Sequence, residues 1–266
     1  SKLPSDIDLI VGIPRSGMIP AYIIGLFLNK NICSLPEFMA GITPSKGERT
    51  VAATSSGNIL IVDDSVFSGN ALEKTKNILK TLADYDKYNF RYCAVFATDR
   101  SQYLVDYYFE LAEDPRLFQW NYLNHSLASS CCYDFDGVLC VDPTDEENDD
   151  GEKYINFILN AKPLFIPQQK IHSIITSRLE KYRPQTEKWL RDHQIKYKNL
   201  YMLDLPSAAE RRRLDCHADF KAKIYSKLKD TICFIESDPV QAQKIADLSG
   251  KQCICCSTDE YFPGKY

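Results

Sequence analysis

Two pairs of carboxylates stand directly after apolar, β-branched runs of the sequence. Asp63 and Asp64 follow the run 58–62, and Asp134 and Asp136 follow the run 130–133. Neighbouring carboxylates can accept hydrogen bonds from sugar hydroxyls or help to hold Mg²⁺, a hard ion that prefers oxygen ligands. An acidic turn is the simpler explanation, but it leaves the residues that follow each pair unexplained.

The first pair opens a loop that suits a phosphate group. The chain continues from Asp64 as SVFSGNA and then enters a helical pattern. A Ser-Gly loop at the start of a helix presents backbone N–H groups and a hydroxyl at the favourable end of the helix dipole. Ligands of parallel α/β sheets bind beyond the carboxyl ends of the strands. This segment therefore predicts a phosphate-binding site.

A second loop of the same kind lies upstream, where the apolar run 8–13 leads into Arg15, Ser16 and Gly17. The two loops, in this order, resemble those of type I phosphoribosyltransferases, and the resemblance covers roughly residues 5–115. It implies that Arg15 contacts the pyrophosphate of 5-phosphoribosyl pyrophosphate (PRPP), with small residues allowing close approach. Asp63 and Asp64 would bind the ribose hydroxyls, directly or through Mg²⁺. The 5-phosphate would be held by the loop residues Phe67, Ser68, Gly69, Asn70 and Ala71.

The sequence departs from this family at two positions of the phosphate loop. Ala71 replaces a common hydroxyl residue, and Phe67 stands where purine-salvage members often carry an acidic base. The general base of the transferase is therefore unassigned. Residues 43–57 lie where the family has a mobile loop, in which Lys46 and Arg49 either contact pyrophosphate or belong to a solvated loop.

The second pair forms the string DFDGVL, which resembles the first motif of the haloacid dehalogenase superfamily of phosphatases. The resemblance implies that Asp134 attacks phosphorus and forms an aspartyl-phosphate. Asp136 would protonate the leaving oxygen and later activate water.

Three further segments of the same resemblance follow in order. Thr176 would hydrogen-bond the transferring phosphoryl group, with Ser177 and Arg178 beside it as substrate contacts. Lys221 would balance the charge of phosphate and aspartate, with Lys223 as the alternative. The implied ligands of Mg²⁺, the expected cofactor, are Asp134, Asp136, Glu236 and Asp238.

Apolar runs alternate with helical patterns along the whole chain, which favours parallel sheets covered by helices. We expect two Rossmann-like, three-layer α/β domains with mainly parallel sheets, 1–126 and 127–266, the second with little or no cap. Strands are expected at 8–13, 58–62, 91–98, 106–111, 130–134, 171–176, 200–203, 231–236 and 252–256. Helices are expected at 71–82, 154–159, 183–193, 220–228 and 239–248. The acidic run 142–152 is most simply a solvated loop.

Composition narrows the classes of function. The 266 residues are 44% hydrophobic and 26% charged with a net charge of −4, so nucleic-acid binding has no electrostatic support. No apolar run reaches the length of a membrane span and no signal-peptide pattern opens the chain, so we expect a cytoplasmic protein. The ten cysteines are expected to be reduced core residues, with a zinc site as the alternative. The four histidines are expected to be structural or exposed.

The two resemblances together imply a bifunctional enzyme. The first domain would transfer 5-phosphoribosyl from PRPP to an acceptor and release pyrophosphate. The second would remove the 5-phosphate and leave a ribofuranosyl group, as in PRPP-dependent enzymes that install ribofuranose in bacterial surface polysaccharides. The expected partners are PRPP and a phosphorylated sugar or glycan acceptor, and a homodimer is left open. The alternatives are a nucleobase phosphoribosyltransferase fused to a separate phosphatase, and a PRPP-sensing binding module.

Overall fold

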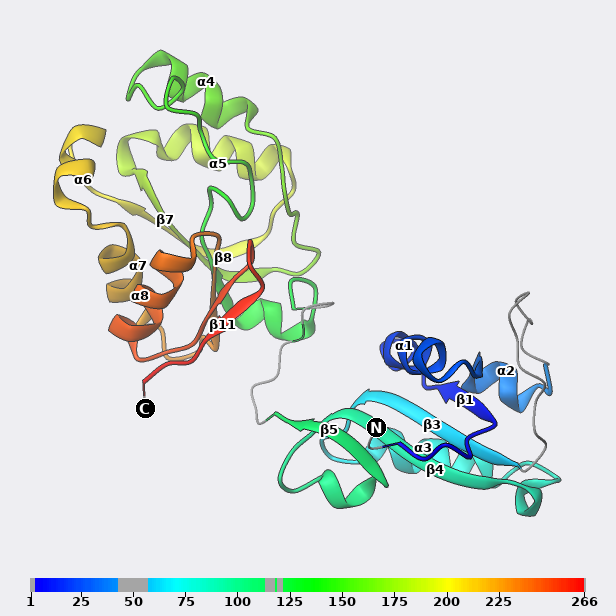
Figure 1. Cartoon of the computed structure of the whole chain (residues 1–266). Helices are drawn as coiled ribbons and strands as arrows, with labels where there is room; N and C mark the ends of the chain where they lie inside the picture. Colours follow the sequence, from blue (N-terminus) through cyan, green and yellow to red (C-terminus); the bar gives the residue numbers. More distant parts are fainter. Residues whose placement is uncertain (1–2, 43–56, 113–117, 119–121, 266) are drawn as a thin grey trace. The chain divides into compact units, whose positions relative to one another are not determined.

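The structure is a computed structural model, which describes residues 3–42, 57–112, 118 and 122–265. The chain divides into two compact units, Ser1–Arg116 (unit 1) and Leu117–Tyr266 (unit 2). Both are α/β units with mainly parallel sheets, which confirms the predicted fold class (Figure 1). The division falls before the predicted boundary at 126–127, and Tyr122, which precedes that boundary, is buried in the core of unit 2.

Unit 1 contains a five-stranded, all-parallel sheet in the order β2-β1-β3-β4-β5. Its strands are β1 (Leu9–Gly12), β2 (Asn31–Ser34), β3 (Asn58–Ser65), β4 (Asn89–Ala97) and β5 (Tyr107–Leu111). Its helices are α1 (Met18–Leu28), α2 (Leu35–Met39) and α3 (Asn70–Leu79). The alternation of side chains along the strands separates two cores. Ile10 and Leu60 pack with α1, whereas Val11 and Ile61 pack with α2 and α3 on the opposite face.

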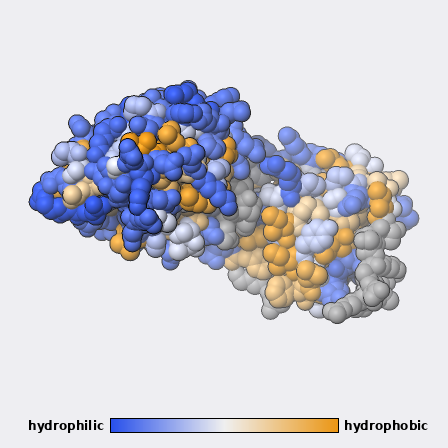
Figure 2. Space-filling model, turned by 90° about the horizontal axis from the view of Figure 1, so that it is seen from above, coloured by the Kyte–Doolittle hydropathy of each residue, from blue (hydrophilic) through white to orange (hydrophobic). Residues whose placement is uncertain are grey.

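Helix α1 also carries an exposed apolar face. Ile19, Ile23, Leu26 and Phe27 are 42, 50, 77 and 87% exposed. Figure 2 looks onto unit 1 from this side and shows apolar side chains gathered there. Apolar patches of this kind often mark contact surfaces. In the described part of the chain, no helix is both long and apolar enough to cross a bilayer.

Unit 2 contains a six-stranded sheet in the order β11-β10-β9-β6-β7-β8, in which only the edge pair β10–β11 is antiparallel. Its strands are β6 (Cys131–Tyr133), β7 (Ile171–Leu179), β8 (Tyr197–Leu203), β9 (Cys233–Glu236), β10 (Cys253–Cys255) and β11 (Glu260–Phe262). Its helices are α4 (Glu152–Asn160), α5 (Arg183–Asp192), α6 (Ala208–Leu214), α7 (His217–Tyr225) and α8 (Pro239–Ser249). Only α4 lies between the first and second motifs of the predicted phosphatase, so that segment is short.

The core of unit 2 also divides by strand alternation. Tyr133 and Ile235 face the layer of α4 and α5, whereas Cys132 and Phe234 face α7 and α8. All ten cysteines of the chain are free and eight are buried, where they pack as small apolar side chains. Burial raises the pKa of the Cys132 thiol to about 12.

Every strand and helix expected from the sequence is present, with ends shifted by a few residues. The elements not anticipated are α1, β2, α2, α6 and β11. Helix α1 is uniformly apolar rather than amphipathic, and α6 and β11 are short. Of these, α6 bears directly on the site in unit 2.

Candidate functional sites

The two loops of unit 1 lie side by side because their strands are neighbours. Gly12 at the end of β1 pairs with Val62 in β3, and the Ile13 N–H donates to the Val62 carbonyl at 2.8 Å. A Cβ atom on Gly17 would lie 2.6 Å from the Ile13 carbonyl oxygen and 2.9 Å from the Cα of Asp63. Only glycine therefore allows the loop after β1 to approach the carboxylate pair this closely.

The carboxylate pair is largely buried at the end of β3. Asp64 is 7% exposed, and its N–H donates to Asp63 Oδ1 at 2.9 Å. Burial, reinforced by the Asp64 charge, raises the pKa of Asp63 to about 7. Within the described residues neither carboxylate has an ion-pair partner. Such a pair is suited to ligand hydroxyls or to a cation.

Hydrogen bonds to the backbone groups of Val66 fix the start of the predicted phosphate loop. The Ser101 hydroxyl, which is fully buried, donates to the Val66 carbonyl at 2.8 Å, and the Val66 N–H donates to the Phe96 carbonyl at 2.9 Å. Gly69, the N-cap residue of α3, has a φ of +78° and makes no side-chain cap. The first N–H groups of a helix have no partner within the helix, so those of α3 are suited to an anion. The Ser68 hydroxyl accepts from the Asn70 N–H at 3.4 Å.

A cavity of about 170 Å³ lies over this loop. Its lining includes most of the predicted ligands of this unit, namely Asp63, Phe67, Ser68, Gly69, Asn70 and Ala71. Asp64, Arg15, Ser16 and Gly17 lie at the adjoining strand ends outside that lining, and Arg15 is exposed. Lys46 and Arg49, with residues 43–56, lie outside the described residues.

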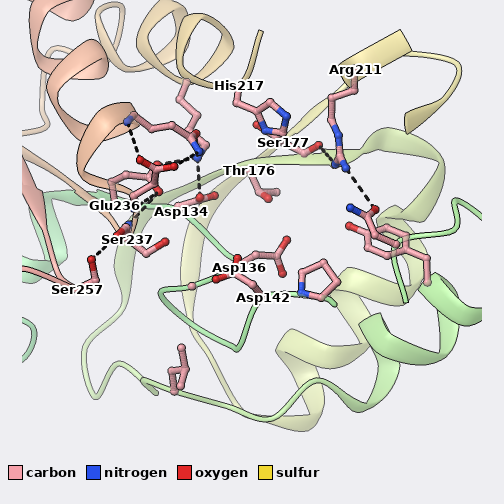
Figure 3. A pocket seen from close by; sticks show the side chains of 18 residues that line it. Asp134, Asp136, Asp142, Thr176, Ser177, Arg211, His217, Glu236, Ser237 and Ser257 are labelled. Carbon is pink, nitrogen blue, oxygen red and sulfur yellow. Dashed lines mark hydrogen bonds and ion pairs between the residues drawn. The ribbon is translucent and has the colours of Figure 1, made fainter. Parts of the chain in front are cut away.

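In unit 2 the predicted motifs meet at one edge of the sheet. Tyr133 pairs with Ile174 on one side and with Ile235 on the other, so the three strands are adjacent and parallel. Asp134 follows β6, Glu236 is the last residue of β9, and Thr176 lies three residues before the end of β7, where the pairing with β8 becomes irregular. They line a cavity of about 580 Å³ (Figure 3). Its lining comprises Asp134, Asp136, Gly137, Asp142, Pro143, Asn148, Tyr154, Leu164, Thr176, Ser177, Arg211, His217, Lys221, Glu236, Ser237, Asp238, Gln241 and Ser257.

Lys221, which is 2% exposed, is the central cation of this cavity. Its Nζ lies 2.6 Å from Asp134 Oδ2, 2.6 Å from Glu236 Oε2 and 3.0 Å from Gln241 Oε1. Burial lowers the pKa of Lys221, but the two carboxylates outweigh burial and hold it above its usual range. Burial raises the pKa of Asp134 to about 8, and the Lys221 ammonium opposes that shift. The alternative, Lys223, is exposed and does not line the cavity.

Asp136 and Arg178 form the second ion pair of the site. Arg178 Nε donates to both carboxylate oxygens of Asp136 at 3.1 Å, and the guanidinium lies 3.9 Å above the Phe135 ring. Arg178 is 1% exposed and is not part of the cavity lining. Its position is thus behind Asp136, where it orients that carboxylate, rather than at the substrate contact expected from the sequence.

The four predicted magnesium ligands all line the cavity, and their oxygen donors suit a hard divalent cation. Their positions do not gather them around one point. Lys221 lies between Asp134 and Glu236, Asp136 is bound by Arg178, and Asp238 caps α8 by accepting from the Val240 and Gln241 N–H groups. Among the described residues no three His, Cys, Asp or Glu side chains form a group that could hold a metal. The donor chemistry fits Mg²⁺, whereas the present arrangement does not.

The loops after β6 and β9 are in direct contact. Gly137 has a φ of +74°, and a Cβ atom there would lie 2.1 Å from the Ser237 hydroxyl, so only glycine allows this approach.

Ser177 also lines the cavity, and its hydroxyl is buried with no hydrogen-bond partner among the described residues. A buried hydroxyl without a partner is costly unless a ligand completes its hydrogen bonding.

The acidic run 142–152 is not simply a solvated loop, and that expectation was wrong. Asp142 lines the cavity, and burial raises its pKa. Asp149 Oδ1 accepts the Gly151 and Tyr154 N–H groups at the start of α4. Asp150 accepts from the Tyr182 hydroxyl at 2.9 Å and from the Ala208 N–H at 3.0 Å, so it connects α6 with the residues before α5.

Among the cavity residues that were not predicted as site residues, Arg211 and His217 carry the side chains with the most direct chemical consequence. Arg211 is buried on α6, and its Nη1 donates to the Ser177 carbonyl at 2.9 Å. His217, expected to be structural or exposed, lines the cavity at the start of α7, and burial together with Arg211 and Lys221 lowers its pKa. The pattern Ser207-x-x-Glu210 is a helix-start signal that would have placed α6.

No family model and no curated protein matches the chain. A purine phosphoribosyltransferase from Pyrococcus horikoshii Ot3 is similar over 44% of this chain and 78% of its own, at 22% identity and a TM-score of 0.31. A xanthine-guanine-hypoxanthine phosphoribosyltransferase from Helicobacter pylori is similar over 43% of this chain and 74% of its own, at 19% identity and a TM-score of 0.32. An orotate phosphoribosyltransferase from Aeropyrum pernix is similar over 40% of this chain and 62% of its own, at 15% identity and a TM-score of 0.27. The structural neighbours are thus phosphoribosyltransferases.

Proposed function

We propose that the protein is a bifunctional enzyme that transfers 5-phosphoribosyl from PRPP to a glycan acceptor and then hydrolyses the 5-phosphate. The observation that carries the proposal is the buried Lys221 ammonium between Asp134 and Glu236, at the floor of a cavity that also holds Asp136 and Thr176. In unit 1 the support is the cavity shared by Asp63 and the loop that precedes α3.

In the transferase half, the backbone of residues 67–71 and the Ser68 hydroxyl bind the 5-phosphate, and Asp63 and Asp64 accept hydrogen bonds from the ribose hydroxyls. Arg15 meets the leaving pyrophosphate. As the C1–O bond to pyrophosphate breaks, positive charge develops on the ribose ring, which the nearby carboxylates stabilise. An acceptor hydroxyl then bonds to C1 and loses its proton to a base that has not been assigned. Catalysis here is mainly positioning and charge stabilisation.

In the phosphatase half, an Asp134 carboxylate oxygen attacks phosphorus and the C5 oxygen of ribose departs with a proton from Asp136. Asp136 then takes a proton from a water molecule, which attacks phosphorus and releases phosphate from Asp134. Thr176, Ser177 and Lys221 hold the phosphoryl oxygens. The carboxylates of this cavity would have to move closer together to hold Mg²⁺, which would then supply neutralisation of phosphoryl charge. Loss of both activities in a chelator, with recovery on added Mg²⁺, would support its inclusion.

The test is mass spectrometry of products from PRPP, Mg²⁺ and a panel of glycan acceptors. The wild-type protein should give ribosylated acceptor, whereas Asp134→Asn should accumulate the phosphoribosylated acceptor with unchanged pyrophosphate release. Asp145→Asn, at an exposed position of the same unit, is the matched control. Loss of both activities in a folded Asp134→Asn protein, or turnover with free nucleobases only, would contradict the proposal.

A further inference from the structure

Arg211 is a buried cation whose protein partners are all uncharged. Its side chain is 7% exposed. Nη1 donates to the Ser177 carbonyl at 2.9 Å, Nη2 lies 3.5 Å from Asn148 Oδ1, and the Tyr154 hydroxyl also interacts with it. Within the described residues Nε has no hydrogen-bond partner and no carboxylate forms an ion pair with this guanidinium.

The other buried arginine of unit 2 makes the contrast clear. Arg178 is also nearly inaccessible, but it is paired with the Asp136 carboxylate and lies behind the cavity wall. A buried charge lowers stability unless an opposite charge or a full set of hydrogen bonds compensates it. Arg178 has that compensation from the protein. Arg211 has no such compensation. Unlike Arg178, it lines the cavity, so a ligand bound there would supply the missing negative charge.

The groups around Arg211 make a site for one negative charge. Asn148, Tyr154 and His217 line the same cavity. Burial raises the pKa of Tyr154 and lowers that of His217, so both are uncharged near neutral pH. A single guanidinium surrounded by neutral donors is well matched to a carboxylate or a phosphodiester, which a guanidinium binds through paired hydrogen bonds.

This site adjoins the groups around the reacting phosphate at Ser177, whose backbone carbonyl Arg211 contacts, and otherwise lies away from them. Lys221, which pairs with Asp134 and Glu236, already supplies a cation there. Figure 3 shows Glu236, Ser237 and Ser257 on one side of the pocket and Arg211 on the other. At about 580 Å³, the cavity has room for more than a phosphate group.

We infer that Arg211 binds a second anionic group, a carboxylate or a phosphodiester, on the molecule whose 5-phosphate is removed. This inference rests on the proposed function and narrows it, since the acceptor that receives ribose would then be an acidic glycan. Arg211 is a specificity residue in this assignment and does not take part in the chemical steps.

The experiment compares two synthetic substrates, methyl ribofuranoside 5-phosphate and carboxymethyl ribofuranoside 5-phosphate, which differ by one carboxylate near C1. The full-length protein should hydrolyse the carboxymethyl compound with a kcat/KM about tenfold higher or more, the usual scale of a charged hydrogen bond. Arg211→Gln should remove that preference and leave the rate on the methyl compound within a factor of about three. Arg212→Gln, an exposed neighbour on α6, should behave as wild type.

Three results would overturn the inference. The first is equal hydrolysis of both substrates by the wild-type protein, which needs no variant. The second is an equal loss on both substrates in Arg211→Gln with an unchanged melting temperature, since that would place Arg211 at the reacting phosphate. If Arg211→Gln does not fold, Arg211→Met replaces it, because methionine keeps a long side chain without the charge. An unaltered preference in that variant would be the third result. Hydrolysis of neither compound would instead remove the proposed phosphatase activity, and the inference with it.

Discussion

The two sites lie at equivalent places, the carboxyl ends of parallel strands, yet they are built in different ways. In unit 1 the predicted phosphate loop consists of backbone groups, held in place by the Ser101 hydroxyl and by the turn at Gly69. In unit 2 the site consists of buried side chains, with Lys221 joining Asp134 to Glu236. A backbone site depends on the path of the chain, whereas a side-chain site depends on charges that the fold must keep compensated. The two should therefore respond differently to substitution.

The largest expected effect is at Lys221. Lys221→Met leaves Asp134 and Glu236 buried without their cation, so unit 2 should lose about 3–5 kcal/mol of unfolding free energy. Phosphate release should fall about 10³-fold or more. Lys223→Met, at the exposed neighbouring position, should change neither quantity. Urea unfolding and a phosphate-release assay measure the two effects, and a larger loss in Lys223→Met would move the predicted role to that residue.

The next effect is at Asp64. Asp64→Asn keeps the size of the side chain but removes the charge beside Asp63, so hydrogen bonds to the ribose hydroxyls weaken. Pyrophosphate release at low PRPP should fall about 10–100-fold, the scale of one charged hydrogen bond. Phosphate release from a preformed ribofuranoside 5-phosphate should be unchanged. Asp86→Asn, exposed in the same unit, is the control, and equal losses in both variants would show a nonspecific charge effect.

A smaller effect is expected in unit 1, where backbone groups form the predicted phosphate loop. Ser101→Ala removes the donor to the Val66 carbonyl and the acceptor for the Thr98 N–H at 2.9 Å. Unit 1 should lose about 1–3 kcal/mol, because buried polar groups lose their partners. Hydrogen exchange should speed up at Val66 and Thr98, while phosphatase activity stays the same. Unchanged exchange at Val66 would mean that other contacts fix this loop.

The smallest effect concerns pH. Burial and Asp64 raise the pKa of Asp63 to about 7 from 3.8, so the folded state holds this proton more strongly than the unfolded chain does. The stability of unit 1 should then fall as pH rises from about 4 to 7 and stay level above that range. Asp63→Asn should be more stable than wild type at pH 8 by on the order of 1–2 kcal/mol, after allowance for solvent screening.

The control for that experiment is the same comparison at about pH 3, below the ordinary Asp pKa of about 3.9, where the wild-type carboxyl is mostly protonated in both states. The two proteins should then unfold at nearly the same denaturant concentration. A stability difference that does not depend on pH would show that Asn acts through packing rather than through charge.

The same contrast explains what could be predicted from the sequence. Asp63, Asp134 and Glu236 follow apolar strands directly, and residues after adjacent parallel strands must meet at one edge. Their convergence in each unit could therefore be anticipated. Arg211 and His217 reach the cavity from helices whose positions depend on tertiary packing, and α6 is only seven residues long. The pairing of Arg178 with Asp136 was missed as well, because sequence does not tell which side of a strand end a long side chain takes.

Asp150 connects the hydrophilic loop before α4 with the first turn of α6, through its hydrogen bond to the Ala208 N–H. The position of Arg211 therefore depends on a segment that contributes none of the groups proposed to break the phosphoester bond. Insertions or replacements in that loop could tilt the helix and alter which molecules fit, while the hydrolytic apparatus stays intact. Substrate preference in the proposed phosphatase is therefore expected to depend on this short segment as well as on the lining of the pocket.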